Sequence, residues 1–167
     1  MKHAWRYGTP NGLDDLLLYE EDGALMELWF EGSRDARSLL DDCRMRKTET
    51  IALACRWLDG YFAGVPPVWL PPVRLSGETP FRHAVLKEMQ RIPFGQTVTY
   101  GDIAKWLAAK LGKGKMSAQA VGGAVGWNPI CIIIPCHRVI GAGGRLTGYG
   151  GGMKNKIALL RHEGVKV

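Results

Sequence analysis

The 167-residue sequence lacks any apolar run near the roughly 20 residues that a membrane-spanning helix needs. It shows no internal repeat, and its first seven residues hold no apolar segment of the kind found in a secretory signal. We therefore expect a cytoplasmic protein, or a nuclear one in a eukaryote, that does not contact membranes. In such a compartment its 4 cysteines are expected to be free thiols rather than a disulfide framework.

Acidic residues are scarce in the second half of the chain. Residues 79–167 hold 3 Asp or Glu against 13 Lys or Arg, a charge of +10. Residues 1–78 hold 13 Asp or Glu against 9 Lys or Arg, a charge of −4. This asymmetry predicts that the second half binds a polyanion. The alternative is a protein whose surface charge is merely uneven. A membrane surface is less favoured, because no basic helix has a large apolar face.

Regular structure is excluded from the proline-rich stretch 65–72, which has four prolines and continues through Ser76-Gly77-Glu78-Thr79-Pro80. We interpret it as a semi-rigid linker. The prediction is a small N-terminal α/β domain with its linker over residues 1–78, and a C-terminal domain over residues 79–167.

Hydrophobic patterns predict the elements of the N-terminal half. Apolar runs at 16–19 and 24–30 flank an acidic turn ending in Gly23, which is typical of a β-hairpin. Residues 50–62 repeat apolar side chains every three to four positions and predict a helix. A hairpin packed on a helix makes a small α+β unit.

The C-terminal half is predicted to be mostly helical, with helices over 80–92, 100–111, 117–125 and 153–162. The second and third are separated by a short Gly/Lys turn, which is the arrangement of a helix-turn-helix. The apolar run at 130–134 predicts a buried strand that ends at Pro135.

Pro135-Cys136-His137-Arg138 is the segment most suggestive of chemistry. A cysteine beside cationic residues can have a lowered pKa and act as a nucleophile. His137 can take the thiol proton, directly or through water, and Glu163 can orient His137. The alternative is that Cys136 is a small core residue. Cys131 is expected to pack in the core, and its spacing from Cys136 and His137 matches no recognised zinc site, so we expect neither a metal nor a cofactor.

Two further residues have local roles to play. Asn128 precedes Pro129 and favours a turn, and its amide can also bridge backbone on both sides of that turn. Tyr149 lies among glycines, which let the backbone approach a ligand closely, and its ring can stack on a planar base. For Tyr149 the alternative is a surface turn with one packed ring.

The second half resembles the active-site domain of the O6-alkylguanine-DNA alkyltransferase family, also called methylated-DNA–protein-cysteine methyltransferases. Residues 135–139, Pro-Cys-His-Arg-Val, match the family hallmark in full. The resemblance covers residues 79–164 in order, through Ile92 to Ala104, Ala120 to Ala124, Asn128-Pro129, Gly148-Tyr149, Gly151-Gly152, Lys156, Leu159-Leu160 and His162-Glu163-Gly164. The first half resembles the family more loosely, through Thr9 to Gly12 and Tyr61 to Gly64.

This resemblance implies an α+β protein whose C-terminal domain is a helix-turn-helix, winged-helix-like, DNA-binding domain. It also implies a monomer without an obligate protein partner. The implied activity is DNA repair: an O6-alkylguanine flips out of duplex DNA, and its alkyl group moves to the Cys136 thiolate. The sulfur stays alkylated, so each molecule of this S-methyltransferase acts once. O4-alkylthymine is a further candidate substrate.

The resemblance also implies a role for each residue at the reacting base. Cys136, His137 and Glu163, linked through a water, would activate the thiol. Tyr100 would donate toward guanine N3, and the Gly150 backbone would donate to O6. Tyr149 would form a pocket wall, and the carbonyls of Cys136 and Val139 would accept the exocyclic amine. Asn128 would hold the turn between the recognition helix and the active site.

The remaining assignments concern DNA and the fold. Ala120 and Gly122 lie on the predicted recognition helix, and Lys113 and Lys115 in the preceding turn would contact phosphates. Arg138 adjoins the base-binding residues, although bracing the fold is its more plausible role.

Two residues depart from the family pattern. Gln119 stands where many members have an arginine that inserts into the duplex, and Trp127 stands where small residues are usual. Trp127 can stack on a base, reshape the pocket entrance or pack against the N-terminal domain. Gln119 leaves two other functions open: a non-catalytic protein that binds alkylated bases, or an alkyltransferase that prefers single strands or small alkylated molecules. A regulator that uses only the helix-turn-helix would leave Cys136 and the glycine loop unexplained.

Overall fold

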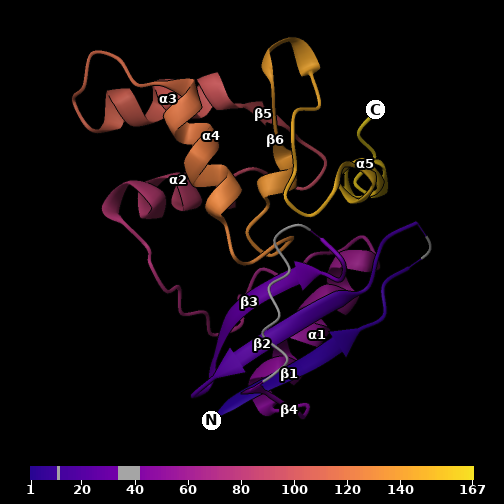
Figure 1. The fold of residues 1–167 in the computed structure, drawn as a ribbon. Coiled ribbons are helices and arrows are strands. Elements are labelled where there is room, and N and C mark those ends of the chain that lie inside the picture. The colour runs from indigo at the N-terminus through magenta and orange to yellow at the C-terminus, as the bar shows by residue number, and fades with distance from the viewer. Residues whose placement is uncertain (11, 34–41) are drawn as a thin grey trace.

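A computed structural model describes residues 1–10, 12–33 and 42–167, so Asn11 of the looser resemblance lies outside the described residues. Its N-terminal part is a mixed sheet in the order β3-β2-β1-β4, with β1 Lys2–Tyr7, β2 Leu16–Glu21, β3 Ala24–Phe30 and β4 Arg44–Met45. Helix α1 (Glu49–Phe62) covers one face of this sheet (Figure 1). The predicted hairpin is confirmed as β2 and β3, and the predicted helix as α1.

Local chemistry explains these elements. Asp22 and Gly23 both have positive φ values, 50° and 79°, as a tight hairpin turn requires. Thr48 caps α1 by accepting a hydrogen bond from the Ile51 amide. The sequence pattern missed β1, which pairs antiparallel with β2, because only Ala4 within β1 is buried and the strand therefore shows no clear alternation.

The C-terminal part contains α2 (Pro80–Gln90), α3 (Tyr100–Lys110), α4 (Ala118–Trp127) and α5 (Met153–His162). Strands β5 (Val98–Thr99) and β6 (Val139–Ile140) pair in parallel between α3 and α5 (Figure 1). The side chains of Thr79, Thr99 and Ser117 cap α2, α3 and α4. The predicted helices and the α+β class are thus confirmed, and α3 and α4 pack together as the helix-turn-helix. Among the described residues, no helix combines the length and apolarity needed to span a membrane.

The predicted strand at 130–134 is wrong. Ile130 forms a single β-bridge with Leu28, after which the chain turns, with Ile134 N donating to the Ile130 carbonyl at 3.2 Å. Ile132 adopts φ 67°, a left-handed conformation that is rare for a β-branched residue. The run is buried, as expected, but a short buried apolar run does not by itself identify a strand. Cys136 consequently begins the short 3-10 helix η2 (Cys136–Arg138) rather than ending a strand.

Strand β3 joins the two parts of the molecule. Near its start, Leu25 N donates to the Pro72 carbonyl at 2.8 Å, so the proline-rich segment lies along this edge. Farther along, Leu28 N donates to the Pro129 carbonyl at 2.9 Å and Cys131 N donates to the Leu28 carbonyl at 3.1 Å. These contacts cover an edge that would otherwise expose unpaired backbone groups. One apolar core includes side chains from both parts, and a domain boundary at residue 78 stays a prediction.

Gly151 lies in the glycine loop, residues 148–152, where this loop packs against β3. Gly151→Ala should therefore destabilise the protein. An added Cβ would lie 2.8 Å from both Phe30 Cδ2 and Tyr149 Cε1. We expect a loss of about 1–3 kcal/mol in the free energy of unfolding, measured by urea titration. Gly148→Ala is the matched control, since its Cβ would meet nothing within 4 Å. Equal stability of the two variants would contradict this packing.

Candidate active site

A small cavity of about 50 Å³ opens in front of Cys136. Its walls come from β3, the start of α3, the middle and end of α4, the turn after Asn128, the loop of residues 148–151 and α5. The lining residues are Trp29, Tyr100, Gly122, Val125, Gly126, Asn128, Cys131, Cys136, Gly148, Tyr149, Gly150, Gly151 and Lys156. Such a volume has room for a few water molecules.

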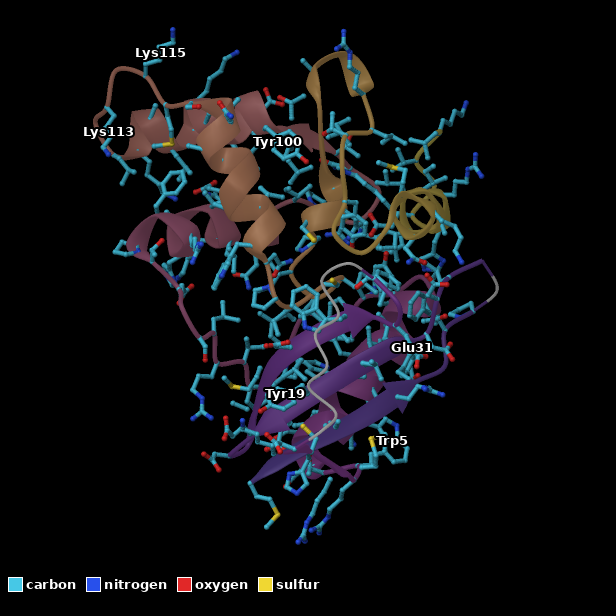
Figure 2. All side chains as sticks on the ribbon, viewed as in Figure 1. Trp5, Tyr19, Glu31, Tyr100, Lys113 and Lys115 are labelled. Atoms are coloured by element: carbon cyan, nitrogen blue, oxygen red, sulfur yellow. The ribbon has the colours of Figure 1, made fainter. Side chains whose placement is uncertain are left out.

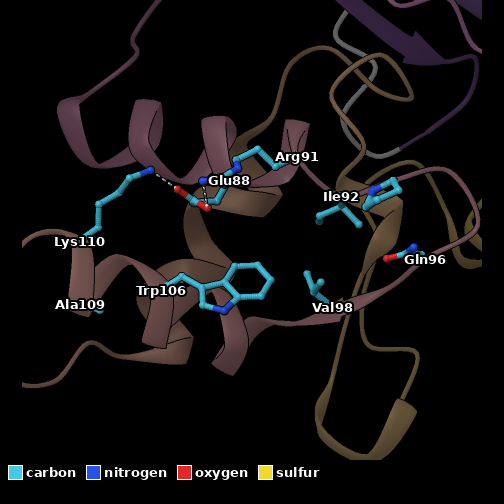
Figure 3. A pocket seen from close by; sticks show the side chains of 9 residues that line it. Glu88, Arg91, Ile92, Gln96, Val98, Trp106, Ala109 and Lys110 are labelled. Atoms are coloured by element: carbon cyan, nitrogen blue, oxygen red, sulfur yellow. Dashed lines mark hydrogen bonds and ion pairs between the residues drawn. The ribbon is translucent and has the colours of Figure 1, made fainter.

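A much larger cavity of about 760 Å³ lies elsewhere, between α2, α3 and β5 (Figure 3). Trp106 and Ile92 line it, and at its wall the Glu88 carboxylate pairs with Lys110 at 2.7 Å and Arg91 at 3.7 Å. No cysteine or histidine lines this cavity. Chemistry rather than size therefore identifies the pocket at Cys136 as the candidate active site.

Cys136 is 7% exposed, and its thiol is surrounded by groups that stabilise the thiolate. A hydrogen bond with the Cys131 thiol lowers the pKa of Cys136 most, burial opposes this, and hydrogen bonds with Asn128 and Tyr149 and the Lys156 charge lower it further, to about 7. The Cys136 Sγ lies 3.9 Å from the Tyr149 hydroxyl. A substantial fraction of Cys136 is thus thiolate at neutral pH.

Cys131 does more than pack in the core. It is buried, as expected, but it also lines the pocket beside Cys136 and influences that thiol. The sequence pattern missed this role because it placed Cys131 inside a strand. The turn instead brings two cysteines five positions apart to one cavity.

His137 and Glu163 form a buried pair. The His137 Nε2 and Glu163 Oε1 atoms lie 2.6 Å apart, and His137 Nδ1 has no hydrogen-bond partner among the described residues. Burial raises the pKa of Glu163, but hydrogen bonds from His137, Arg138 and the Gly95 amide outweigh it and hold that pKa at about 2. An ionised Glu163 can only accept hydrogen bonds, so the neutral His137 ring must carry its proton on Nε2. Its Nδ1 atom is then a hydrogen-bond acceptor. Burial lowers the pKa of His137, against the raising effect of Glu163.

Arg138 lies behind the site rather than in the pocket. Its guanidinium donates to both Glu163 oxygens, with Nε 2.9 Å from Oε2, and to the Ile92 carbonyl at 2.7 Å. Arg138 does not line the cavity at Cys136. This geometry favours the bracing role, and the assignment of Arg138 to base binding stays a prediction.

Asn128 bridges the turn that leads to Cys136. Its Nδ2 donates to the carbonyls of Ile130 (3.2 Å) and Ile134 (2.8 Å), and its Oδ1 accepts from the Ile130 amide at 3.0 Å. These bonds close the turn in which Ile132 has its strained conformation. Asn128 also ends α4 as its C-cap, so it joins α4 to the Cys136 segment.

The backbone carbonyls assigned to the exocyclic amine already have protein donors. The Val139 carbonyl accepts from Lys156 Nζ at 2.7 Å, and the Cys136 carbonyl accepts from the Val139 amide. A carbonyl oxygen has two lone pairs and can accept a second hydrogen bond. Lys156 has no predicted role, although its place on the α5 face shared with Leu159, Leu160 and Glu163 indicates burial.

The other predicted DNA-contacting residues fall into two groups. Tyr100, Gly122, Tyr149 and Gly150 line the cavity at Cys136. Gln119 and Ala120 are exposed at the start of α4, and Gln119 lines an open groove shared with Tyr100 and Gly148. Lys113 and Lys115 project from the α3–α4 turn, far from the sheet (Figure 2).

Trp127 lies away from the cavity at Cys136. The Arg82 guanidinium of α2 sits 4.6 Å from the Trp127 ring centroid, a cation–π contact. An added Cβ at Gly77 would lie 4.0 Å from the same ring. Trp127 therefore packs between α2 and the linker, rather than lining the cavity.

The described residues contain no group of three or more His, Cys, Asp or Glu side chains that could hold a metal ion.

Comparison with known proteins agrees with this geometry. The family model described as the DNA-binding domain of 6-O-methylguanine DNA methyltransferase matches residues 80–165. A methylated-DNA–protein-cysteine methyltransferase of Methanosarcina acetivorans is 41% identical over 150 residues, covering 89% of this chain and 90% of the relative. The chain belongs to the O6-methylguanine DNA methyltransferase family. The resemblance noted in the sequence is thereby confirmed.

Other members of this family extend the comparison. A relative of the same name from Salmonella typhimurium is 50% identical over 107 residues, which cover 64% of this chain and 60% of that protein. The crystal structure of the Mycobacterium tuberculosis O6-methylguanine methyltransferase superposes with a TM-score of 0.81 at 37% identity, covering 98% of this chain and 93% of that one. The family fold therefore extends over both parts of the molecule.

The contact between the two pocket cysteines predicts the effect of Cys131→Ala. Loss of the Cys131 hydrogen bond should raise the pKa of Cys136 and shift its modification by iodoacetamide to higher pH. Peptide mass spectrometry would follow Cys136 separately from the other cysteines. Cys131→Ser retains a donor and should react more like the unmodified protein. Superimposable pH profiles for Cys131→Ala and the unmodified protein would contradict the contact.

Proposed function

We propose that this protein repairs alkylated DNA by transferring the alkyl group of O6-alkylguanine to the sulfur of Cys136, once per molecule. The observation that carries this proposal is a buried cysteine of lowered pKa beside a buried His137–Glu163 pair. The family relatives named methylated-DNA–protein-cysteine methyltransferases support it. We further propose that it acts as a monomer without a cofactor, in the cytoplasm or, in a eukaryote, the nucleus.

The proposed reaction begins with proton transfer. His137 Nδ1 accepts the Cys136 proton through one bridging water, and Glu163 stabilises the resulting imidazolium through Nε2. The thiolate then attacks the alkyl carbon in line with the departing oxygen. The new S–C bond forms as the C–O6 bond breaks. The electron pair of the C–O6 bond moves into the departing guanine.

The leaving guanine needs donors because negative charge develops on it. Tyr100 begins α3 and lines the cavity, so its hydroxyl can donate toward N3, and the Gly150 backbone can donate to O6. The product is an S-alkyl thioether, which has no good leaving group for a second transfer. The acceptor is therefore consumed with each transfer.

Entry of a base requires the glycine loop to move. The cavity of about 50 Å³ holds a few waters, which is less room than a purine needs. One wall is Tyr149 within Gly148–Gly152, a segment whose glycines allow backbone rearrangement. We propose that this loop opens for the flipped base and that Tyr149 then forms one wall.

The DNA-binding surface in this proposal is the start of α4 with the preceding turn. Gln119 and Ala120 are exposed there, and Lys113 and Lys115 supply positive charge for phosphates. The net charge of +10 over residues 79–167 supports the same surface. The M. tuberculosis protein OGT, 37% identical with a TM-score of 0.79, has been crystallised in complex with DNA.

Gln119 favours a second candidate function, alkyl transfer from a substrate other than duplex DNA. Its side chain is shorter than arginine and uncharged, so it fills less of the gap that a flipped base leaves. A non-catalytic role in binding alkylated bases would leave the activated Cys136 unexplained. O4-alkylthymine remains a further candidate substrate of the same cavity.

The decisive experiment mixes the protein with an oligonucleotide containing O6-methylguanine and measures its intact mass and peptides. We expect stoichiometric gain of one methyl group on Cys136, and none in Cys136→Ala. Tight binding to the lesion without transfer would instead indicate a protein that binds alkylated bases. Absence of both transfer and lesion-selective binding would direct the search to small alkylated molecules.

Gln119→Arg tests whether the short, uncharged side chain of Gln119 limits alkyl transfer from duplex DNA. If the short side chain limits base flipping, this variant should transfer about tenfold faster from duplex DNA and no faster from single strands. Gln90→Arg, at the exposed end of α2, adds the same charge on another helix and serves as the control. Single-turnover rates on both substrates measure the effect. An unchanged duplex rate would mean that this protein flips bases without an inserted cation.

A further inference from the structure

Tyr61 connects the N-terminal part of the molecule to the active site. It lies on α1, is fully buried, and its hydroxyl donates to Glu163 Oε1 at 2.8 Å. Glu163 follows α5, 102 residues farther along the chain. Sequence analysis gave Tyr61 no role beyond helix packing and a loose family match.

Tyr61 and His137 share one oxygen of Glu163. Oε1 accepts from the Tyr61 hydroxyl and from His137 Nε2, and it also lies 3.0 Å from an Arg138 nitrogen. Oε2 accepts from the Gly95 amide and from Arg138 Nε. Each donor stabilises the carboxylate and so weakens its pull on the others. The strength of the His137–Glu163 bond therefore depends on Tyr61.

Aromatic packing fixes the Tyr61 ring in this position. Trp57 stacks on it at 5.8 Å between centroids, Phe94 meets it edge-on at 5.7 Å, and His162 lies at 5.2 Å. The His137 ring is also edge-on, at 6.3 Å. Burial raises the pKa of Tyr61 well above its usual value, so the phenol stays protonated and remains a donor. A residue needed only to fill this space would not require a hydroxyl.

We propose that Tyr61 is a positioning residue that sets the proton balance between Cys136 and His137 by sharing Glu163 Oε1 with His137. This inference rests on the proposed function. The charged and titratable groups facing His137 and Glu163 are Tyr61 from α1, Arg138 from η2 and Lys156 from α5, with His162 packed on the Tyr61 ring. Removing Arg138 would also remove a positive charge and the hydrogen bond to the Ile92 carbonyl. Removing the Tyr61 hydroxyl takes away one neutral donor to Glu163.

The sign of the effect follows from the shared oxygen. Without the Tyr61 hydroxyl, Glu163 accepts more strongly from His137 Nε2, which raises the pKa of His137. His137 then takes the Cys136 proton more readily, and the thiolate forms at lower pH. We expect Tyr61→Phe to move the acid limb of Cys136 reactivity down by about half a pH unit.

The test measures iodoacetamide modification of Cys136 against pH, without DNA, alongside single-turnover transfer from the O6-methylguanine oligonucleotide. Tyr7→Phe is the matched control: it removes another phenol hydroxyl, one that donates to Asp59 of the same helix at 2.7 Å, and should leave the limb unmoved. Replacing Tyr61 by 3-fluorotyrosine keeps the ring and strengthens the donor. It should move the limb to higher pH, and it provides a second test should Tyr61→Phe fold poorly.

A limb at lower pH in Tyr61→Phe together with a limb at higher pH in the fluorinated protein would support the inference. An unmoved limb in both proteins, or shifts in the reverse directions, would overturn it and leave Tyr61 a packing residue. If the limb shifts but the unmodified protein transfers no methyl group, the role of Tyr61 stands and the proposed function fails. If the unmodified protein transfers methyl groups and the limb does not move, the proposed function stands and this inference fails.

Discussion

The buried carboxylate of Glu163 is the group on which the geometry of the active site depends. A carboxylate in a protein interior is stable only when donors satisfy both oxygens. Here those donors come from separate parts of the chain: Tyr61 on α1, the Gly95 amide after α2, and His137 and Arg138 on η2. Satisfying one charge therefore fixes α1, α5 and the helix of the reactive cysteine relative to one another.

A second constraint places Cys136 itself. The Asn128 amide closes the turn after α4, and β3 holds the start of the same turn through Leu28. The left-handed conformation of Ile132 is tolerated because side-chain and backbone hydrogen bonds over-determine the turn. As a result, the backbone that carries the thiol is fixed from both sides, by α4 and by the N-terminal sheet. The backbone position of Cys136 thus does not depend on the opening that we propose for the glycine loop.

Sequence reasoning succeeded where local chemistry determines structure and failed where partners lie far apart in sequence. The helices have regular apolar spacing and capping residues such as Thr99 and Ser117, so their ranges could be predicted closely. The run at 130–134 could not, because burial alone makes a turn and a strand look alike. Similarly, Tyr61 has the pattern of an ordinary core residue. Its hydrogen bond to Glu163 exists only because the fold brings positions 102 residues apart into contact.

These contacts change what the N-terminal part contributes. The family model covers residues 80–165 and contains Cys136, His137 and Glu163. Yet the Tyr61 hydroxyl, the β3 edge and the Phe30 ring against Tyr149 all come from outside that range. The ring centroids of Phe30 and Tyr149 lie 6.5 Å apart, so the sheet supports the pocket wall as well as the carboxylate. If the glycine loop opens while β3 and α1 stay in place, the thiol and its proton acceptor keep their geometry as the pocket widens. In the proposed mechanism the sheet would thereby separate two requirements of the site, a fixed nucleophile and an entrance that opens.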